Sequence, residues 1–538
     1  MSSNAASASA ASLRASPRQW FGLAILLLPT MLMTADLGVL WLATPYLAAD
    51  LQPSSSQLLW TTDIYGFMTA GFLVIMGTMG DRIGRRRLLM IGAVGFIIAS
   101  LIAAYSTSPE MLIAARGVLG VAGAAVLPST LSLISHMFAD PRQRATAIAM
   151  WVTALSVGLA IGPVIGGGLL ASWWWGSVFL IGVPVMLLAL VTAPVLLPEY
   201  RDPNAGRLDL TSVALFLLGI LPVVYGIKRI AEYGLSWQVG LAFVAGAVFS
   251  VLFARRQGRL ASPLLDLRLF SNRGFTGALL TLLFGMTALN GVEYLVPQYL
   301  QQVAGQTALG AGLWLLPGAV GLILGSQLTP VLARRVRPAY VLLVGTLVSL
   351  VGYWMTAQVG SDDSGVVLAS VALAVIMLGV APISVLGTAL AVGSSEPEKA
   401  GSAAATGQTA YDLGLAMGIA VSGSVAVAVY RSEVADSAPS GVPAAAAEAA
   451  RDTLGGAAAA AARLPGELGN DLLISAREAF TTGLHTAAFV SVGFALATAV
   501  LIFTLLRHIP AFGSQETAPE AVESGAPEAQ PTNKVPTH

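Results

Sequence analysis

Apolar runs of about 18 residues or more recur along the chain from Trp20 to Leu506, separated by short clusters of Pro, Gly and Arg. A run of this length is what an α-helix needs to cross the hydrocarbon core of a bilayer. Charged residues make up only 10% of the chain, whereas soluble domains carry about 25%. The sequence therefore predicts an all-α integral membrane protein.

Breaking the apolar runs at those clusters predicts fourteen membrane-spanning helices. The expected spans are 20–47, 57–79, 88–106, 110–137, 145–171, 176–197, 210–231, 237–254, 275–300, 309–333, 339–358, 365–392, 402–430 and 483–506. The first span is too long for a cleavable signal peptide and is expected to be retained.

Basic residues predict how these helices are oriented, because Lys and Arg in short loops resist translocation. Most of the 28 basic residues fall on the side of the membrane that also holds the termini. The short loops of the other side hold only Lys228 and Arg229. We therefore expect a multi-pass protein of the cytoplasmic membrane with both termini in the cytoplasm. The formal net charge of zero argues against a nucleic-acid partner.

Two segments depart from the regular pattern. In the long outer loop 431–482, the stretches 443–463 and 466–480 predict a pair of short surface helices. This loop either caps the outer mouth of the bundle or is a tolerated insertion. The tail 513–538 is rich in Pro, Glu, Ser, Ala and Thr, a composition typical of disorder.

The loop between the second and third spans carries a glycine, acid and arginine motif. Glycines permit a tight turn there, and an acid can accept hydrogen bonds from arginines. The motif resembles the signature G-x-x-x-D-R-x-G-R-[KR]-x of the major facilitator superfamily, in which it acts as a conformational latch; the alternative is that its arginines only enforce topology. Its residues are Gly77, Asp81, Arg82, Gly84, Arg85 and Arg86.

Two further motifs resemble drug:proton antiporters of that superfamily. Small residues spaced by four let helix backbones touch, and a proline bends a helix. The fifth span matches the antiporter pattern G-x-x-x-G-P-x-x-G-G with Gly158, Gly162, Pro163, Gly166 and Gly167. The fourth span matches R-x-x-x-G-x-x-x-A, beginning at Arg116 and continuing through Gly120.

The runs around Asp36, around Trp60 to Tyr65 and around Tyr411 to Gly414 resemble fourteen-helix quaternary-ammonium efflux transporters. That resemblance implies a proton-coupled exporter of amphipathic, cationic or lipophilic drugs, with two six-helix halves that rock around a central cavity. It implies a tail at 1–19, a first half at 20–200, an inserted helix pair at 201–272, a second half at 273–512 that includes the loop 431–482, and the tail 513–538.

Ionisable residues inside membrane spans are costly and normally face a partner or a water-filled path. Asp36 lies about 24 Å along its helix from Trp20, and Asp63 and Arg116 lie at a similar depth. The three side chains could meet. Asp36 would then carry or relay the proton, with Arg116 modulating its affinity; the alternative is a purely structural cluster of Asp36, Asp63 and Arg116.

Two more acids lie in the second half. Asp412 falls about 15 Å into its helix, near the midplane, where the resemblance implies a role in binding substrate or protons. Upstream of it the chain has Gly407 and Gln408 where the resembled transporters carry acids, which puts doubly charged substrates in doubt. Glu293 is an additional acid near the end of its span, and is either functional or interfacial.

Recognition of lipophilic cations also needs an apolar, aromatic wall. Aromatic residues near membrane surfaces more often anchor the protein at the interface. The candidates for the wall are Trp60, Tyr65, Trp151 and Trp314, with Met33, Phe67, Met68 and Tyr294 as further possibilities.

The sequence offers little for other classes of function. There is no cysteine, the four histidines show no metal-ligand spacing, and no P-loop is present to bind ATP. We therefore expect no enzymatic activity, no metal or cofactor, and a proton gradient as the energy source of a monomer. A dedicated exporter of one metabolite, siderophore or self-made antibiotic is the alternative. An uptake symporter and a regulatory membrane protein are less favoured, the first because of the motif at Gly162 and Pro163.

Overall fold

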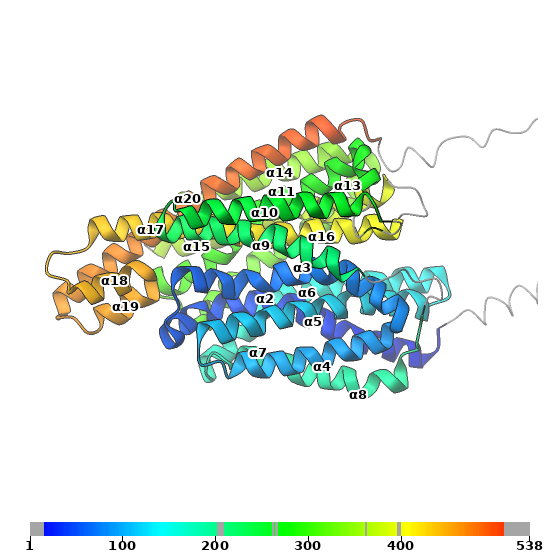
Figure 1. The fold of residues 1–538 in the computed structure, drawn as a ribbon, viewed down its shortest axis with the longest axis horizontal. Coiled ribbons are helices and arrows are strands. Elements are labelled where there is room, and N and C mark those ends of the chain that lie inside the picture. The colour runs from blue at the N-terminus through cyan, green and yellow to red at the C-terminus, as the bar shows by residue number, and fades with distance from the viewer. Residues whose placement is uncertain are drawn as a thin grey trace, which may run out of the picture.

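The computed structural model describes residues 15–201, 209–260, 263, 267–360, 363–394 and 400–510. Within these ranges the chain forms helices and no strand. The helices lie nearly parallel in two bundles, one from each half of the sequence (Figure 1). Residues 1–14 of the predicted tail 1–19, and all of the predicted tail 513–538, lie outside the described residues.

The first bundle contains six spans. Pro and Ser residues begin several of them: Pro17 and Pro109 occupy first-turn positions, and the side chains of Ser54 and Ser108 accept hydrogen bonds from the backbone of the helix that follows. The helices are α2 (Pro17–Leu51), α3 (Ser55–Ile83), α4 (Arg85–Ala104), α5 (Pro109–Met137), α6 (Pro141–Ser172), and the pair α7 (Ser177–Leu180) and α8 (Gly182–Leu196).

The second bundle also contains six spans, several of them interrupted by a short irregular turn. They are α11 (Arg273–Gln298) with η2 (Tyr299–Val303), α12 (Ala308–Trp314) with α13 (Leu316–Arg335), α14 (Pro338–Thr356), α15 (Asp363–Gly393), α16 (Ala400–Gly418) with η4 (Ile419–Gly423) and α17 (Ser424–Ser437), and α20 (Gly466–Leu501) with η5 (Ile502–Leu506). The short helix η1 (Leu267–Ser271) precedes them.

Two helices connect the bundles, α9 (Leu210–Tyr233) and α10 (Trp237–Gln257). They pack against each other, and α9 also contacts α3 of the first bundle and α17 of the second. The inserted pair therefore lies along the junction between the bundles (Figure 1). At one end of the pair, Arg256 donates two hydrogen bonds to Asp209, at 2.9 and 3.1 Å.

The described residues hold thirteen helices that are long and apolar enough to cross a membrane, and fourteen when α3 is counted as one bent span. The bend of 53° in α3 falls between Leu73 and Ile75. The predicted fourteen-helix fold is confirmed. The domain boundaries inferred from the sequence stay a prediction.

The two ends of the bundle differ. The start of α2 and the end of α20 lie at one end, which we call the termini end, while two short helices project at the other, which we call the hairpin end (Figure 1). The short helices are α18 (Ala444–Asp452) and α19 (Leu454–Ala461). They separate at Thr453, whose side chain accepts a hydrogen bond of 2.9 Å from Gly456 N and so begins α19.

One prediction about this region is wrong. The stretch 466–480 is not a separate surface helix but the first part of α20, which begins at Gly466 rather than near 483. No proline interrupts the chain there, and Leu472, Ala476 and Ala479 recur at helical spacing and are fully or almost fully buried. The apolar stripe of the membrane span therefore continues beyond the membrane-sized segment.

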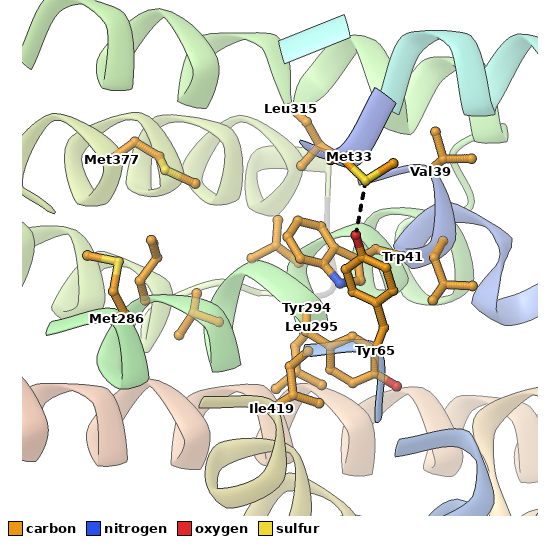
Figure 2. Packing of buried hydrophobic residues seen from close by; sticks show 14 of the residues in the cluster. Met33, Val39, Trp41, Tyr65, Met286, Tyr294, Leu295, Leu315, Met377 and Ile419 are labelled. Carbon is orange, nitrogen blue, oxygen red and sulfur yellow. Dashed lines mark hydrogen bonds between the residues drawn. The ribbon is translucent and has the colours of Figure 1, made fainter. Parts of the chain in front are cut away.

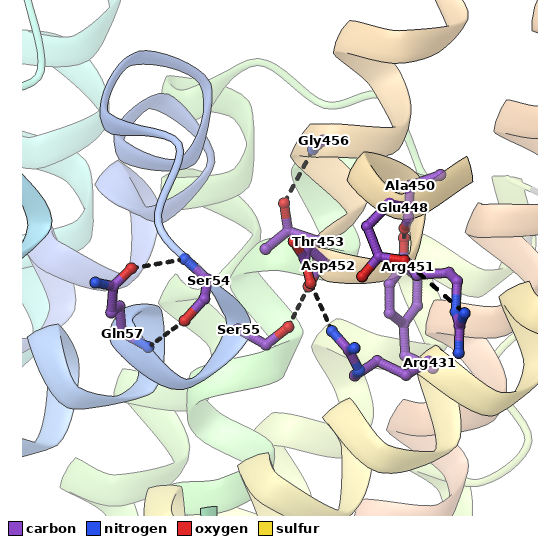
Figure 3. Close-up of polar contacts among 11 residues, drawn as sticks. Ser54, Ser55, Gln57, Arg431, Glu448, Ala450, Arg451, Asp452, Thr453 and Gly456 are labelled. Atoms are coloured by element: carbon purple, nitrogen blue, oxygen red, sulfur yellow. Dashed lines mark hydrogen bonds and ion pairs between the residues drawn. The ribbon is translucent and has the colours of Figure 1, made fainter. Parts of the chain in front are cut away.

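Residues 438–465, which we call the hairpin, contact both bundles. Arg431 of α17 forms an ion pair of 2.6 Å with Asp452, and Tyr430 donates a hydrogen bond of 2.7 Å to the carbonyl of Ala450. From the first bundle, Ser55 donates a hydrogen bond to the carbonyl of Asp452 (Figure 3). The hairpin thus bridges the two bundles at one end of the molecule.

Candidate functional site

Glycines of α6 set the position of Asp36. A Cβ added at Gly162 would lie 2.6 Å from the carbonyl oxygen of Ala35, so only glycine lets α6 approach α2 this closely. Gly158 and Gly166 face α2 in the same way, one turn to either side. The motif in α6 therefore fixes the helix that carries Asp36.

Gly167 and Pro163 face the other bundle. A Cβ at Gly167 would lie 2.5 Å from the carbonyl of Ala308 in α12, and one at Gly312 would lie 2.6 Å from the carbonyl of Pro163. One motif therefore packs α6 against both α2 and α12. The backbones of the two bundles approach closely where these small residues lie.

Asp36 pairs with Arg116 inside the first bundle. Arg116 Nη1 donates a hydrogen bond of 2.5 Å to Asp36 Oδ2, and Arg116 is fully buried while Asp36 is 9% exposed. The Arg116 guanidinium also bonds the carbonyl of Thr61 and lies 4.7 Å from the centre of the Tyr65 ring. The contacts of Arg116 thus tie α5 to α2 and to α3.

Tyr65 lies on α3, a helix that contacts both bundles. Its hydroxyl donates a long hydrogen bond of 3.7 Å to Met33 Sδ of α2 (Figure 2). Helix α3 also packs against α16, the helix that carries Asp412. Asp412 therefore belongs to a helix that meets the first bundle at the junction.

Asp412 itself is held only on one side. Gln408 Nε2 donates a hydrogen bond of 3.0 Å to Asp412 Oδ1 from one turn earlier in α16. The other oxygen, Oδ2, is buried and has no hydrogen-bond partner among the described residues. Gln408, which replaces an acid of the resembled transporters, thus supports Asp412 instead of adding charge.

Asp63 does not join Asp36 and Arg116. Its carboxylate pairs instead with Lys228 of α9, at 2.8 and 3.0 Å, and both side chains are fully buried. The sequence analysis counted Lys228 with the short loops although it falls within the predicted span 210–231. The loop assignment is wrong, because Lys228 lies inside α9 and is buried. The sequence did carry a signal for this pair, a lysine within an apolar run.

Glu293 lies at the junction between the bundles, not at an interface with lipid headgroups, since it is only 7% exposed. It lines a small pocket together with Trp41 of α2 and Met377 of α15. The pocket has walls from α2 and α6 on one side and from α11, α13 and α15 on the other. Trp41 was missed from the sequence because nothing distinguishes it from an interfacial tryptophan.

The four aromatic candidates do not form one wall. Tyr65 stands beside Arg116, and Trp60 lies under Lys228. Trp151 donates a hydrogen bond of 3.1 Å to Thr130 within the first bundle, and Trp314 lies in α12 with its carbonyl bonded by Ser370. Of the four, Tyr65 alone lies against the guanidinium that pairs with Asp36.

The glycine, acid and arginine motif joins α3 to α4 and to the end of α8. Asp81 pairs with Arg85, and Gly84 has a φ of 112°, which favours glycine. Arg86 donates its backbone N–H to Glu199 and its guanidinium to the carbonyl of Leu197. All of these contacts lie within the first bundle.

Two residues of the motif, Gly77 and Arg82, make few contacts, whereas Glu199 outside the motif makes several. A Cβ at Gly77 would meet nothing within 4 Å, and Arg82 is exposed. Glu199 accepts contacts from Arg86 and Arg87. The sequence analysis missed Glu199, although an acid just after an apolar run and opposite three arginines was a usable signal.

No group of three or more His, Asp or Glu side chains in the described part of the chain could hold a metal ion. Residues 26–419 match the profile of the Major Facilitator Superfamily, which covers most of the fold described above. The chain belongs to the major facilitator superfamily. This major facilitator is accordingly a membrane transporter of small molecules.

Named proteins resemble this major facilitator over nearly their whole length. It is 40% identical over 496 residues to "Multidrug efflux pump LfrA" of Mycolicibacterium smegmatis, covering 92% of this chain and 98% of that protein. It is 33% identical to "Methyl viologen resistance protein SmvA" of Salmonella typhimurium, covering 88% and 96%. It is 30% identical to "Tetracenomycin C resistance and export protein" of Streptomyces glaucescens, covering 90% and 92%.

A solved structure shares the fold of this major facilitator. The crystal structure of a bacterial homologue of the human lysosomal transporter Spinster superimposes with a TM-score of 0.62 and covers 91% of this chain and 98% of its own. At 17% identity this similarity concerns the fold alone.

Proposed function

We propose that this transporter exports amphipathic organic molecules, cationic or lipophilic, in exchange for protons, and so confers resistance to drugs or antibiotics. The names of the similar proteins support export of drugs: one is a multidrug efflux pump and another a methyl viologen resistance protein. The transporter acts as a monomer in the cytoplasmic membrane, with both termini in the cytoplasm and the hairpin outside. It needs no ATP, metal or cofactor.

The observation that carries proton coupling is the buried pair of Asp36 and Arg116. Protonation of Asp36 removes its charge and releases Arg116. With Asp36 on α2 and Asp412 on α16, each bundle contributes an acid that can hold a proton or a substrate cation. A cavity that holds either a proton or a substrate cation, but not both at once, couples the inward movement of protons to the outward movement of substrate.

Asp412 and Glu293 are the proposed substrate acids. The buried oxygen of Asp412 without a hydrogen-bond partner among the described residues is available to a cation. Glu293 lines the pocket together with Trp41 and Met377. These apolar side chains suit a lipophilic ligand. Asp63 is the exception among the acids, since Lys228 already neutralises it.

The test is drug-dependent proton release from inside-out vesicles, followed with a quenched pH dye and a panel of cationic, neutral and acidic amphiphiles. We expect fluorescence recovery with cationic amphiphiles for the natural protein and none for Asp36→Asn. The matched control is Asp50→Asn on the same helix, because an asparagine oxygen still accepts the hydrogen bond of 2.6 Å from Trp175. Equal recovery with Asp36→Asn would remove Asp36 from coupling.

A dedicated exporter of one product is the second candidate, because the "Tetracenomycin C resistance and export protein" is 30% identical over 90% of this chain. The same vesicle panel separates the two. Response to several unrelated cations supports multidrug export, whereas silence toward all of them favours the dedicated exporter.

A further inference from the structure

The side chain of Lys228 is enclosed by an acid and an aromatic ring. Its ammonium lies 2.8 and 3.0 Å from the two oxygens of Asp63 and 4.0 Å from the centre of the Trp60 ring. Lys228 and Asp63 are fully buried, and Trp60 is partly buried. Both Asp63 and Trp60 belong to α3, three residues apart, whereas the lysine comes from α9.

An acid beside the face of an aromatic ring is a binding site for organic cations. The carboxylate supplies opposite charge, and the ring face attracts the cation most strongly when water is excluded. Lys228 brings to this place an alkyl chain that ends in an ammonium group. It is itself a tethered alkylammonium ion, and it fills the site from within the protein.

The site lies at the junction between the bundles. Helix α9 packs against α3, η4 and α17. Trp60 packs against an apolar cluster made of Phe67 from α3, Val224 from α9, Ala416 from α16 and Ala420 from η4. Both bundles therefore contribute to the surroundings of the site, and the inserted helix pair supplies the lysine that occupies it.

We propose that Asp63 and Trp60 form an organic-cation site that Lys228 occupies, so that Lys228 determines specificity by keeping substrate cations off Asp63. The link to specificity rests on the proposed export of cations; the existence of the site does not. With Lys228 in place, the acids left for substrate are those at Asp412 and Glu293.

The consequence of removing Lys228 follows from the cost of a buried charge. Lys228→Ala leaves Asp63 uncompensated beside an empty, alkyl-sized space, which is strongly destabilising. A small alkylammonium ion can refill that space and restore both the charge and the ring contact. A neutral alcohol of the same length can restore only the volume.

The experiment is thermal unfolding of the full-length protein in detergent, with n-butylammonium and n-butanol as the two probes. We expect n-butylammonium to raise the melting temperature of Lys228→Ala in a concentration-dependent way. n-Butylammonium should not raise the melting temperature of the natural protein or of the double variant Asp63→Asn/Lys228→Ala. n-Butanol should not raise the melting temperature of any one of the three proteins more than that of the others. Equal shifts with butylammonium in all three proteins would overturn the proposal.

A variant that cannot be purified alone still decides the question. Recovery of folded Lys228→Ala only when n-butylammonium is present during purification supports the site. The opposite result is that Lys228→Ala cannot be purified with either probe although the double variant Asp63→Asn/Lys228→Ala can. It would show that only the lysine can fill the space, and it would contradict the proposed site.

Specificity is tested separately by equilibrium binding of tetraphenylphosphonium and of methyl viologen. Relative to the natural protein, Lys228→Ala should gain affinity for the doubly charged methyl viologen by at least about tenfold, the scale of one added charge contact. The gain should vanish in Asp63→Asn/Lys228→Ala. Absence of any gain despite rescue by butylammonium would leave a cation site but remove Lys228 from specificity.

The outcome of the rescue experiment with n-butylammonium is independent of whether the protein exports drugs. If the natural protein binds and transports no cation, the proposed function fails, while the rescue of Lys228→Ala by n-butylammonium still stands or falls by itself.

Discussion

Arg116 donates a hydrogen bond of 2.5 Å to Asp36, and its guanidinium is completely buried between α2, α3 and α5. A buried charge without its partner is far more costly than the absence of both charges. The pair therefore acts as one unit, and substitutions of its two members should not be additive.

We expect Arg116→Met to lower the stability of the transporter by about 3–5 kcal/mol, because Asp36 is left buried and unpaired. The double variant Asp36→Asn/Arg116→Met should lose much less. Thermal unfolding in detergent of the natural protein, both single variants and the double variant measures the coupling. Additive losses would show that the two side chains do not depend on each other.

The close approach of α6 to α2 predicts that Gly162→Ala impairs transport strongly, by about tenfold or more, because its Cβ meets the Ala35 backbone and must displace the helix that bears Asp36. The measurement is drug efflux from cells with matched expression. Gly168→Ala is the control, since a Cβ there meets nothing within 4 Å. Similar efflux by both variants would mean that α2 can shift without consequence.

Contact between the hairpin and α2 predicts a conformational lock. An added Cβ at Gly455 would lie 3.2 Å from the Cβ of Ala48, near disulfide range, and the natural chain has no cysteine to interfere. We expect Ala48→Cys/Gly455→Cys to stop transport when oxidised, because opening the hairpin end separates the bundles that the hairpin bridges. Reductant should restore it.

Each single cysteine variant is the control for that experiment and should transport with or without oxidant. Full transport by a completely cross-linked double variant would show that the hairpin moves with α2 throughout the cycle, and would favour the alternative of a tolerated insertion.

The contact between Asp209 and Arg256 predicts a dependence of stability on pH. The hydrogen bonds from Arg256 lower the pKa of Asp209 below its ordinary value of 3.8, and bonds from Ser212 add to this. A lowered pKa stabilises the folded state above the ordinary value, and the contribution disappears as the pH falls through the lowered pKa. The effect is small because Arg256 is 38% exposed.

We therefore expect the natural protein to melt slightly higher than Asp209→Asn at pH 7, with the difference shrinking as the pH falls below the ordinary pKa of 3.8 and through the lowered one. Asparagine is suitable because it still caps the first turn of α9. Unfolding curves of both proteins across this range make the comparison. A difference that persists unchanged at low pH would assign it to packing and not to charge.

Much of the fold could be predicted because it depends on local features of the sequence. The length of each apolar run sets a membrane span, and the glycines at 158, 162 and 166 recur on one helical face whatever the helix packs against. The start of α20 was predicted wrongly for the same reason, that only local features of the sequence were available. A hydropathy pattern reports where the membrane-sized segment lies, not how far the helix continues beyond it.

The sequence by itself determined the number of spans, the all-α class and that Asp36, Asp63, Arg116 and Asp412 lie inside apolar runs. Only the tertiary structure decided which of them pair. Asp36 and Asp63 were equally eligible for Arg116, and the choice depends on how each helix is rotated and on which helix lies beside it. Asp63 pairs with Lys228, which is 165 residues away in the sequence, because α9 packs against α3 where Asp63 lies. Such a neighbour is set by packing over the whole molecule, which no local pattern contains.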